Sequence, residues 1–251
     1  MSSITISLIV FACIFGGALL GIFLHTSLPQ HHLAPDSKDI VKLGMGLVGT
    51  MAALVLGLLV ASAKGSYDAQ SAELTQMSAN IALLDRALAL YGPETKEQRA
   101  MLRDAITRML DQFWPKDGSS ASSATPTAAR AEILYEKIQG LSPKNDVQRS
   151  LQGQALSIAV DIGKTRYLMF AQQATSVSMP LLVVLVLWLT VIFISFGLFA
   201  PVNGTVVASL FVSALSVSGA IFLILEMYTP FEGLMQVSSA PLRSALAHLG
   251  Q

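Results

Sequence analysis

The feature of the sequence that most constrains the fold is an uninterrupted apolar run at residues 43–63, LGMGLVGTMAALVLGLLVASA. About 21 helical residues, at roughly 1.5 Å each, cross a hydrocarbon core of roughly 30 Å. No proline follows until Pro93, and a polar but helically patterned segment continues as far as Tyr91. Gly92 and Pro93 then form a stop signal in the order typical of a helix end. The stretch predicts one long helix that leaves the membrane and becomes a stalk.

The polar part of this stretch carries apolar side chains at spacings of three and four, the pattern of one face of an amphipathic helix. These residues are Leu74, Met77, Ile81, Leu84, Leu88 and Tyr91. Such a seam is suited to coiled-coil-like packing, and either the chain's own helices or neighbouring subunits can fill it. We expect part of the seam to lie between subunits, so that the stalk holds the helices around a common axis.

The composition supports a membrane protein. Of the 251 residues, 53% are hydrophobic and 13% charged, whereas soluble domains carry about 25% charged residues. The formal net charge is zero, so nothing indicates a polyanionic partner, and we expect no nucleic acid. The single cysteine, Cys13, lies in an apolar run, which excludes an intrachain disulfide and any zinc or redox motif.

Three further apolar runs are long enough to span a membrane. The first, residues 4–24, is preceded by no Lys or Arg and followed by no A-x-A site, so we expect an uncleaved helix rather than a signal peptide. The others are residues 180–200 and, after a tight turn at residues 201–204, a run that continues to Leu225. Together with residues 43–63 they predict four crossings.

The polar region between the second and third runs predicts three more helices. The first is expected at residues 94–114, where Thr95 and Gln98 near its start resemble a capping box. After a flexible loop come residues 127–141 and then a helix that Ser142 and Pro143 would start. The expected fold is therefore all-α, with four transmembrane helices and a helical cytoplasmic insertion between the second and third. The expected divisions are 1–64 and 179–226 for the helix pairs, 65–178 for the insertion and 227–251 for the C-terminal segment.

Four crossings place both termini and residues 65–178 on one side of the membrane. Near the membrane that side carries Lys64, Lys164, Arg166 and Arg243, whereas the other side carries Lys38 and Lys42. Because cytoplasmic loops carry an excess of Lys and Arg, this modest bias favours a multi-pass membrane protein with a cytoplasmic insertion.

The sequence carries little that suggests an enzyme. No ionisable residue lies well inside the four apolar runs, where proton-coupled transporters place functional groups. The insertion has no nucleophile constellation, phosphate loop or metal spacing, so we expect no catalytic residue, cofactor or metal. Residues 25–42 contain two aspartates and three histidines in a spacing that fits no ligand template, which favours a solvated loop. They are His25, His31, His32, Asp36 and Asp39.

Two of the runs carry small or weakly polar residues at helical spacing. The strip in the second run is Gly46, Gly49, Thr50, Ala53 and Gly57, and the strip in the fourth is Thr205, Ser209, Ser213, Ser216 and Ala220. One interpretation is close helix packing through small-xxx-small contacts. The other is a pore lining, in which hydroxyls and exposed backbone replace an ion's water and apolar residues gate by dewetting. Spacing alone favours packing and leaves the pore open.

Glu226 is the one acid at the end of a spanning run. Lys64, Lys164 and Arg166 are expected at the same interface, so an ion pair with one of them is one interpretation. A solvated interfacial acid is the other.

Two regions carry a resemblance to a known family. The first, which leaves the second run, contains LGLLVASAKGSYD and ELTQMSANIALLDRAL. The second, LILEMYTPFEGLMQVSSAPL near the C-terminus, has an acid–x–x–x–Pro–Phe–x–Gly pattern. Both resemble the bacterial bestrophin-like family of uncharacterised membrane proteins, over roughly residues 43–246. The matching residues are Asn80, Glu226, Pro230, Phe231 and Gly233.

The resemblance implies four membrane helices with a cytoplasmic helical part. Through a remoter similarity to bestrophin channels, it also implies a homo-oligomeric, anion-conducting channel. The chain departs from true bestrophins because it has no acidic calcium-clasp cluster. The first hypothesis is thus a homo-oligomeric channel whose partners are membrane lipid, copies of itself and a small inorganic ion. Its rival is a non-conducting scaffold or regulatory protein that binds a partner through its cytoplasmic helices.

Overall fold

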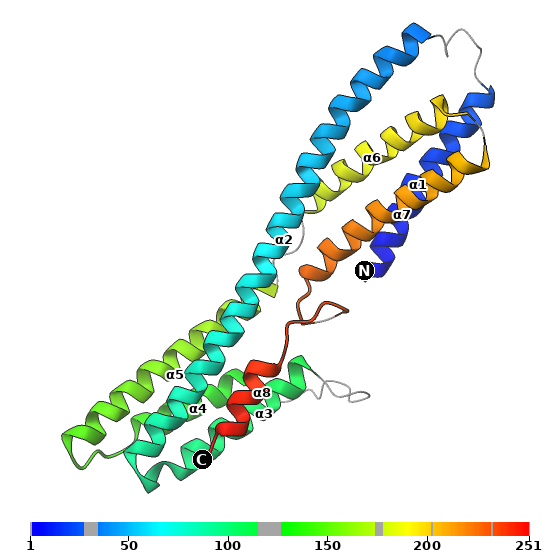
Figure 1. The fold of residues 1–251 in the computed structure, drawn as a ribbon. Helices are drawn as coiled ribbons and strands as arrows, with labels where there is room; N and C mark the ends of the chain where they lie inside the picture. Colours follow the sequence, from blue (N-terminus) through cyan, green and yellow to red (C-terminus); the bar gives the residue numbers. More distant parts are fainter. Residues whose placement is uncertain are drawn as a thin grey trace. The chain divides into compact units, whose positions relative to one another are not determined.

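The computed structural model describes residues 2–27, 35–114, 127–173, 178–201, 203–231 and 233–250. Within these residues the chain is all-α (Figure 1), as the sequence predicts. It divides into two compact units. The first unit comprises Met1–Ser66 and Ser176–Thr229, and the second comprises Tyr67–Thr175 and Pro230–Gln251.

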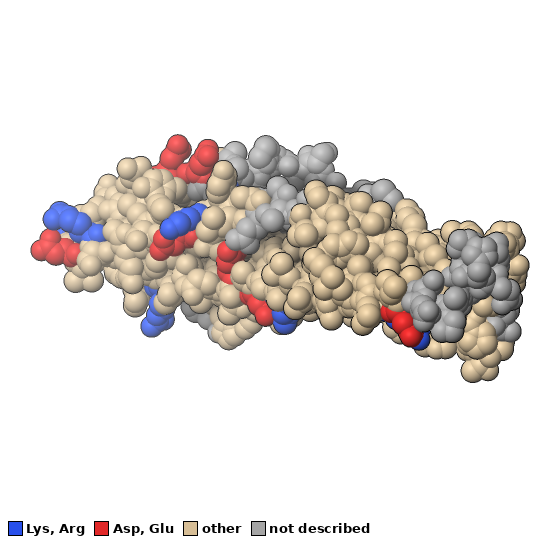
Figure 2. All heavy atoms as spheres, turned by 90° about the horizontal axis from the view of Figure 1, so that it is seen from above, with Lys and Arg blue, Asp and Glu red and all other residues tan. Residues whose placement is uncertain are grey.

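The first unit holds the four helices that are long and apolar enough to cross a membrane. They are α1 (Ser3–Ser27), the first part of α2 (Pro35–Tyr91), α6 (Met179–Phe199) and α7 (Gly204–Met227). Each coincides with one of the four predicted runs. On the face drawn in Figure 2, a wide area of the surface shows no charged side chain, as expected where a protein meets hydrocarbon.

The helix α1 packs against both α6 and α7. Glycines allow the closest approach: a Cβ built on Gly197 would lie 2.2 Å from the carbonyl oxygen of Ala18, and one on Gly21 would lie 2.1 Å from that of Ile194. Nearer the start of α1, the hydroxyl of Ser218 in α7 donates to the carbonyl of Ser7 at 3.0 Å. Small residues therefore bring these backbones together, as is common between membrane helices.

The structure corrects the prediction of a solvated loop at residues 25–42. The helix α1 continues to Ser27 and α2 begins at Pro35, so both ends of this segment are helical. A proline is favourable in the first helical turn, because it has no N–H that needs a partner there. His31 and His32 lie outside the described residues.

The second unit is built from the stalk part of α2 with η2 (Pro93–Thr95), α3 (Lys96–Phe113), α4 (Thr127–Gln139), α5 (Asp146–Gln173) and α8 (Ala240–His248). Helix α3 contacts α4 and α8, and α4 contacts α5. Their apolar faces enclose one core, to which the C-terminal segment contributes Phe231, Val237 and Leu242.

The stalk seam lies in this core. Met77 and Ile81 are 0% exposed, and Leu74, Leu84 and Leu88 are 1% exposed, within a single chain. The expectation that part of the seam lies between subunits is therefore wrong. The apolar periodicity correctly identifies a buried face, but the chain's own helices cover it.

Two helix starts also differ from the prediction. The Thr95 hydroxyl does not cap α3 but donates to the carbonyls of Leu88 and Gly92, so there is no capping box. The helix α5 begins after Asn145 rather than after Ser142, and the Asn145 side chain accepts from the amide of Gln148 at 2.8 Å. Asn is among the strongest N-cap residues, and here it satisfies an amide that has no partner within the helix. The helix α8 in the C-terminal segment was not predicted.

Candidate functional site

The spanning part of α2 is the least covered membrane helix of the chain. Only 11% of its residues are buried, against 28% for α6 and α7 and 33% for α1. One face carries large apolar side chains that all point outward at spacings of three and four. They are Ile40, Leu43, Leu47, Met51, Leu54 and Leu58. This helix thus has an almost complete surface available for lipid or other chains.

The predicted strip of small residues on α2 is also open. A Cβ built at Gly46, Gly49 or Gly57 would have no other atom of the described chain within 4 Å. Thr50 and Ala53 are exposed, and the Thr50 hydroxyl donates back to the carbonyl of its own helix at 2.7 Å. In α7 the predicted residues Thr205, Ser209, Ser213 and Ser216 are likewise exposed.

The glycines that do pack within the chain are different ones. Gly17, Gly21 and Gly197 make the close contact of α1 with α6, and sequence reasoning did not select them. A signal was available, because Gly17 and Gly21 form a G-x-x-x-G pair inside an apolar run.

The structure brings part of the two predicted strips together. A groove of about 660 Å³ lies in the first unit among α2, α6 and α7. Gly46 and Gly49 of α2 line it with Ser209 of α7, whereas the other predicted strip residues do not. Its remaining lining is Lys38, Val41, Lys42, Met45, Ile192, Ser195, Phe196, Phe199, Ala200, Val206 and Leu210.

Basic side chains gather at the end of α6, beside this groove. The Lys38 ammonium donates to the carbonyl of Phe199 at 3.1 Å and lies 5.9 Å from the centre of its ring. His25 Nδ1 lies 2.7 Å from the carbonyl of Leu198, and since a carbonyl only accepts, this nitrogen carries the hydrogen. Carbonyls at a helix C-terminus have no partner within the helix and attract positive charge. The two contacts therefore complete the end of α6.

The described residues contain no group of three or more His, Cys, Asp or Glu side chains placed to hold a metal ion. His25 is engaged with the backbone, and Asp39 lies 3.4 Å from the Lys42 ammonium. Among the described residues around this groove, both groups are therefore already engaged and leave no set of metal ligands. What the arrangement offers is an uncovered helix and an apolar groove with lysines at one end.

A comparison with known protein families identifies the chain. The family model for the Bestrophin-like domain matches residues 12–242, which include nearly all of both units. The chain belongs to the Bestrophin-like family. This is a family of membrane proteins and not of enzymes. No curated protein and no solved structure matches the chain.

The Bestrophin-like ending, Pro230–Phe–x–Gly233, forms a turn that attaches the C-terminal segment to α3. The Pro230 carbonyl accepts from the amide of Val237 at 2.7 Å. Gly233 has a φ of 82°, which a residue with a side chain rarely adopts. The Phe231 ring lies 4.9 Å from that of Phe113 and 5.6 Å from that of Trp114. These residues therefore build the second unit, and their pattern is explained by packing.

The other two family-matching residues lie in different surroundings. Asn80 is half-buried on the stalk and accepts from the side chain of Gln76 at 3.2 Å. Glu226, in the last turn of α7, is only 4% exposed, which does not fit a solvated acid. A buried carboxylate needs hydrogen bonds or an opposite charge, and its pairing with Lys64 or Arg166 stays a prediction.

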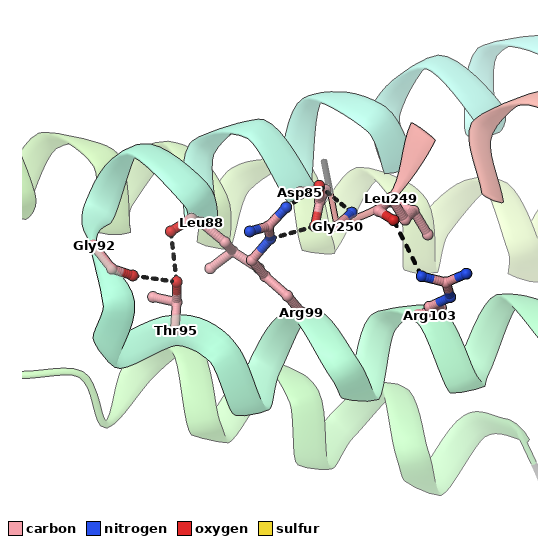
Figure 3. Close-up of polar contacts among 8 residues, drawn as sticks. All are labelled: Asp85, Leu88, Gly92, Thr95, Arg99, Arg103, Leu249 and Gly250. Carbon is pink, nitrogen blue, oxygen red and sulfur yellow. Dashed lines mark hydrogen bonds and ion pairs between the residues drawn. The ribbon is translucent and has the colours of Figure 1, made fainter. Parts of the chain in front are cut away.

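A partly buried ion pair that sequence reasoning missed contacts the last residues of the Bestrophin-like chain (Figure 3). Arg99 of α3 donates two hydrogen bonds to Asp85 of the stalk, at 2.7 and 2.8 Å, and the Gly250 amide approaches the same carboxylate at 3.3 Å. Arg103 donates to the carbonyl of Leu249 at 3.3 Å. Burial raises the pKa of the Asp85 carboxyl, but the hydrogen bonds from Arg99 and Gly250 outweigh it and hold the pKa below its usual value.

Proposed function

We propose that the chain forms a homo-oligomeric channel in the bacterial inner membrane that conducts small inorganic anions, with α2 nearest the axis. The observation that carries the proposal is the bare spanning part of α2, of which 11% is buried within one chain. Membership of the Bestrophin-like family supports a membrane role for the same region.

A strip of small residues on α2 favours an axial position over a purely lipid-facing one. The strip formed by Thr50, Ala53 and Gly57 exposes a hydroxyl and bare backbone next to small side chains. The Thr50 hydroxyl donates to the Leu47 carbonyl, and rotation of its side chain would let it donate to a passing anion instead, which leucine side chains cannot do. The large apolar face centred on Leu47 and Leu54 then meets lipid or neighbouring copies. Gly46 and Gly49, nearer the start of the same helix, line the groove.

An anion as the permeant ion fits the absence of acids from this strip, since cation channels commonly carry rings of Asp or Glu. The described part of the spanning α2 segment, from Leu43 to Ala63, has no acidic residue. Calcium gating is not proposed, because no acidic calcium-binding cluster is present in the sequence.

We propose that both termini and residues 65–178 are cytoplasmic. On a background with Cys13 replaced by serine, a cysteine at Ser120 should be shielded from an impermeant thiol reagent in intact cells. A cysteine at Gln30 should be labelled. Both positions lie outside the described residues, between helices. The reverse labelling pattern would overturn the orientation.

Ion flux from the purified protein in liposomes tests the function. Chloride and nitrate should cross faster than sodium and potassium, and native mass measurement should find an oligomer in the same preparation. An intact oligomer that conducts none of these ions would favour the scaffold hypothesis. A monomer that conducts would contradict the placement of α2 at an axis.

A further inference from the structure

The groove among α2, α6 and α7 points to a bound lipid. We propose that it holds one acyl chain of an anionic phospholipid, whose phosphate is bound by Lys38 and Lys42. This site goes beyond the proposed function, because it lies within one chain and does not depend on conduction.

The groove extends from the expected membrane surface into one leaflet. On α2 it runs from Lys38 to Gly49, and the apolar run begins at Leu43, so about 9 Å of its length lies beside hydrocarbon. Half of a hydrocarbon core of roughly 30 Å is about 15 Å. The groove can therefore hold the part of an acyl chain nearest the headgroup, with Lys38 and Lys42 at the level of the phosphate.

The lining is suited to an acyl chain. Apart from the two lysines and two serines, every side chain that lines the groove is apolar or absent. Gly46 and Gly49 lower the α2 wall, since a Cβ at either would point into open space among the described atoms. The rings of Phe196 and Phe199 form part of the opposite wall on α6.

The charge at one end selects the headgroup. Lys38 uses one of its three N–H donors on the Phe199 carbonyl, which leaves donors for a phosphate oxygen. Lys42 lies 3.4 Å from Asp39, and both side chains are more than half exposed, so this pair is weak and readily exchanged. The described lining of the groove itself includes both lysines and no acidic side chain. A phosphodiester that lacks a cationic headgroup complements it.

The groove and the leucine face of α2 are separate surfaces. Residues that line the groove recur at positions 38, 42, 45 and 49, whereas Leu43, Leu47 and Leu54 lie on the opposite side of the helix. A neighbouring chain has the whole leucine face available and does not need the groove. The charge at the groove's end therefore favours a lipid over a second copy there.

Native mass spectrometry of the purified full chain tests the site with three probes. These are phosphatidylglycerol, phosphatidylcholine with the same acyl chains, and glycerol phosphate as the headgroup alone. We expect tight binding of phosphatidylglycerol, at least tenfold weaker binding of phosphatidylcholine, and no retention of glycerol phosphate. Retention of glycerol phosphate as strong as that of the lipid would overturn the acyl-chain assignment.

Variants separate the two parts of the site. Combined Lys38→Gln and Lys42→Gln should remove the preference for phosphatidylglycerol, while the control pair Lys96→Gln and Lys137→Gln, far along the sequence in the second unit, should keep it. Gly49→Leu should weaken both lipids at least fivefold. Gly44→Leu, on the opposite face of the same helix, should not. Unchanged lipid binding in Gly49→Leu would refute the groove as the site, and dissociation of the oligomer by this variant alone would assign the groove to a second copy.

Discussion

The two parts of α2 differ in how far their apolar side chains are buried, although they form one helix. In the stalk, the apolar face from Leu74 to Leu88 is at most 1% exposed at each seam position, and the chain's own helices cover it. In the membrane-spanning part, Leu43, Leu54 and Leu58 are each more than 60% exposed. The same spacing of apolar residues therefore leads to burial in one part and to exposure in the other.

The difference reflects the solvent that each part meets. In water, an apolar face must be covered, because each exposed square ångström costs about 25 cal/mol. In a bilayer, lipid tails are as apolar as leucine, and only close packing, hydrogen bonds or a functional path favour protein contacts. The apolar face of the stalk is thus fully covered within one chain. The apolar face of the spanning part is free to contact lipid, other copies of the chain or an ion path.

The largest effect should come from a matched pair of leucines. Leu84→Ala in the stalk leaves a cavity in a packed core and should destabilise the second unit by about 3 kcal/mol. Leu54→Ala, on the same helix, should change thermal stability in detergent by less than about 0.5 kcal/mol. Equal losses in thermal denaturation would show that the spanning face is also covered within the chain.

The glycines offer a comparison inside the membrane unit. Gly197→Val should cost about 3 kcal/mol, because its Cβ would meet the backbone carbonyl of Ala18, which cannot move as a side-chain end can. Gly44→Val should be tolerated, since that Cβ meets nothing within 4 Å among the described atoms. Yield of folded protein and melting temperature in detergent measure both. A tolerated Gly197→Val would mean that α1 and α6 do not rely on this approach.

The Asp85–Arg99 pair should make the stability of the second unit depend on pH in acid. Asp85→Asn should destabilise the second unit by about 2 kcal/mol at pH 7, since hydrogen bonds to charged groups are worth roughly 1.5–3 kcal/mol. The folded pKa of Asp85 lies below its unfolded value of about 3.9. The pair's contribution is therefore complete above that value and is lost as the pH falls through the folded pKa. Denaturant titrations should show the variant and the original chain converging in acid, and a constant difference would contradict the pairing.

The smallest effect on stability should accompany a change in function. Gly57→Val adds side-chain atoms to the open strip of α2. It should change the free energy of unfolding in detergent by less than about 0.5 kcal/mol. If Gly57 faces the axis, anion flux per oligomer should fall several-fold, because the added methyl groups narrow the path. Gly44→Val on the opposite face is the control. Equal flux in both variants would remove Gly57 from the path.

The sequence was sufficient for the spans and for the face of the stalk. Runs of about 20 apolar residues and a period near 3.6 are local properties, and the structure has helices where they predict them. It was not sufficient to say what covers the seam, because periodicity identifies a buried face and not its partner. The small residues posed the same problem: those on α2 are open, and Gly21 and Gly197 make the contact.

The ends of helices and the contacts between distant helices were harder to predict, because they depend on residues far apart in the sequence. The turn from Pro35 to Lys42 is polar and resembles a loop, yet it is helical, and Lys38 there reaches the carbonyl of Phe199, more than 150 residues away. Ser142 and Pro143 also fit the pattern of a helix start, but the structure uses Asn145 as the N-cap of α5. The Asp85–Arg99 pair joins two helices, and local patterns carry no sign of which charges will meet.

Crosslinking along α2 tests the central claim, that copies of the chain surround an axis lined by its spanning part. With Cys13 replaced by serine, a single cysteine is placed at Thr50, Ala53 or Gly57 in native membranes and treated with a bifunctional thiol reagent. We expect covalent dimers and higher species at these positions, and none from Leu84→Cys, since Leu84 is buried within one chain. Only monomers at all three positions, with each cysteine still reactive toward a single-headed reagent, would contradict it.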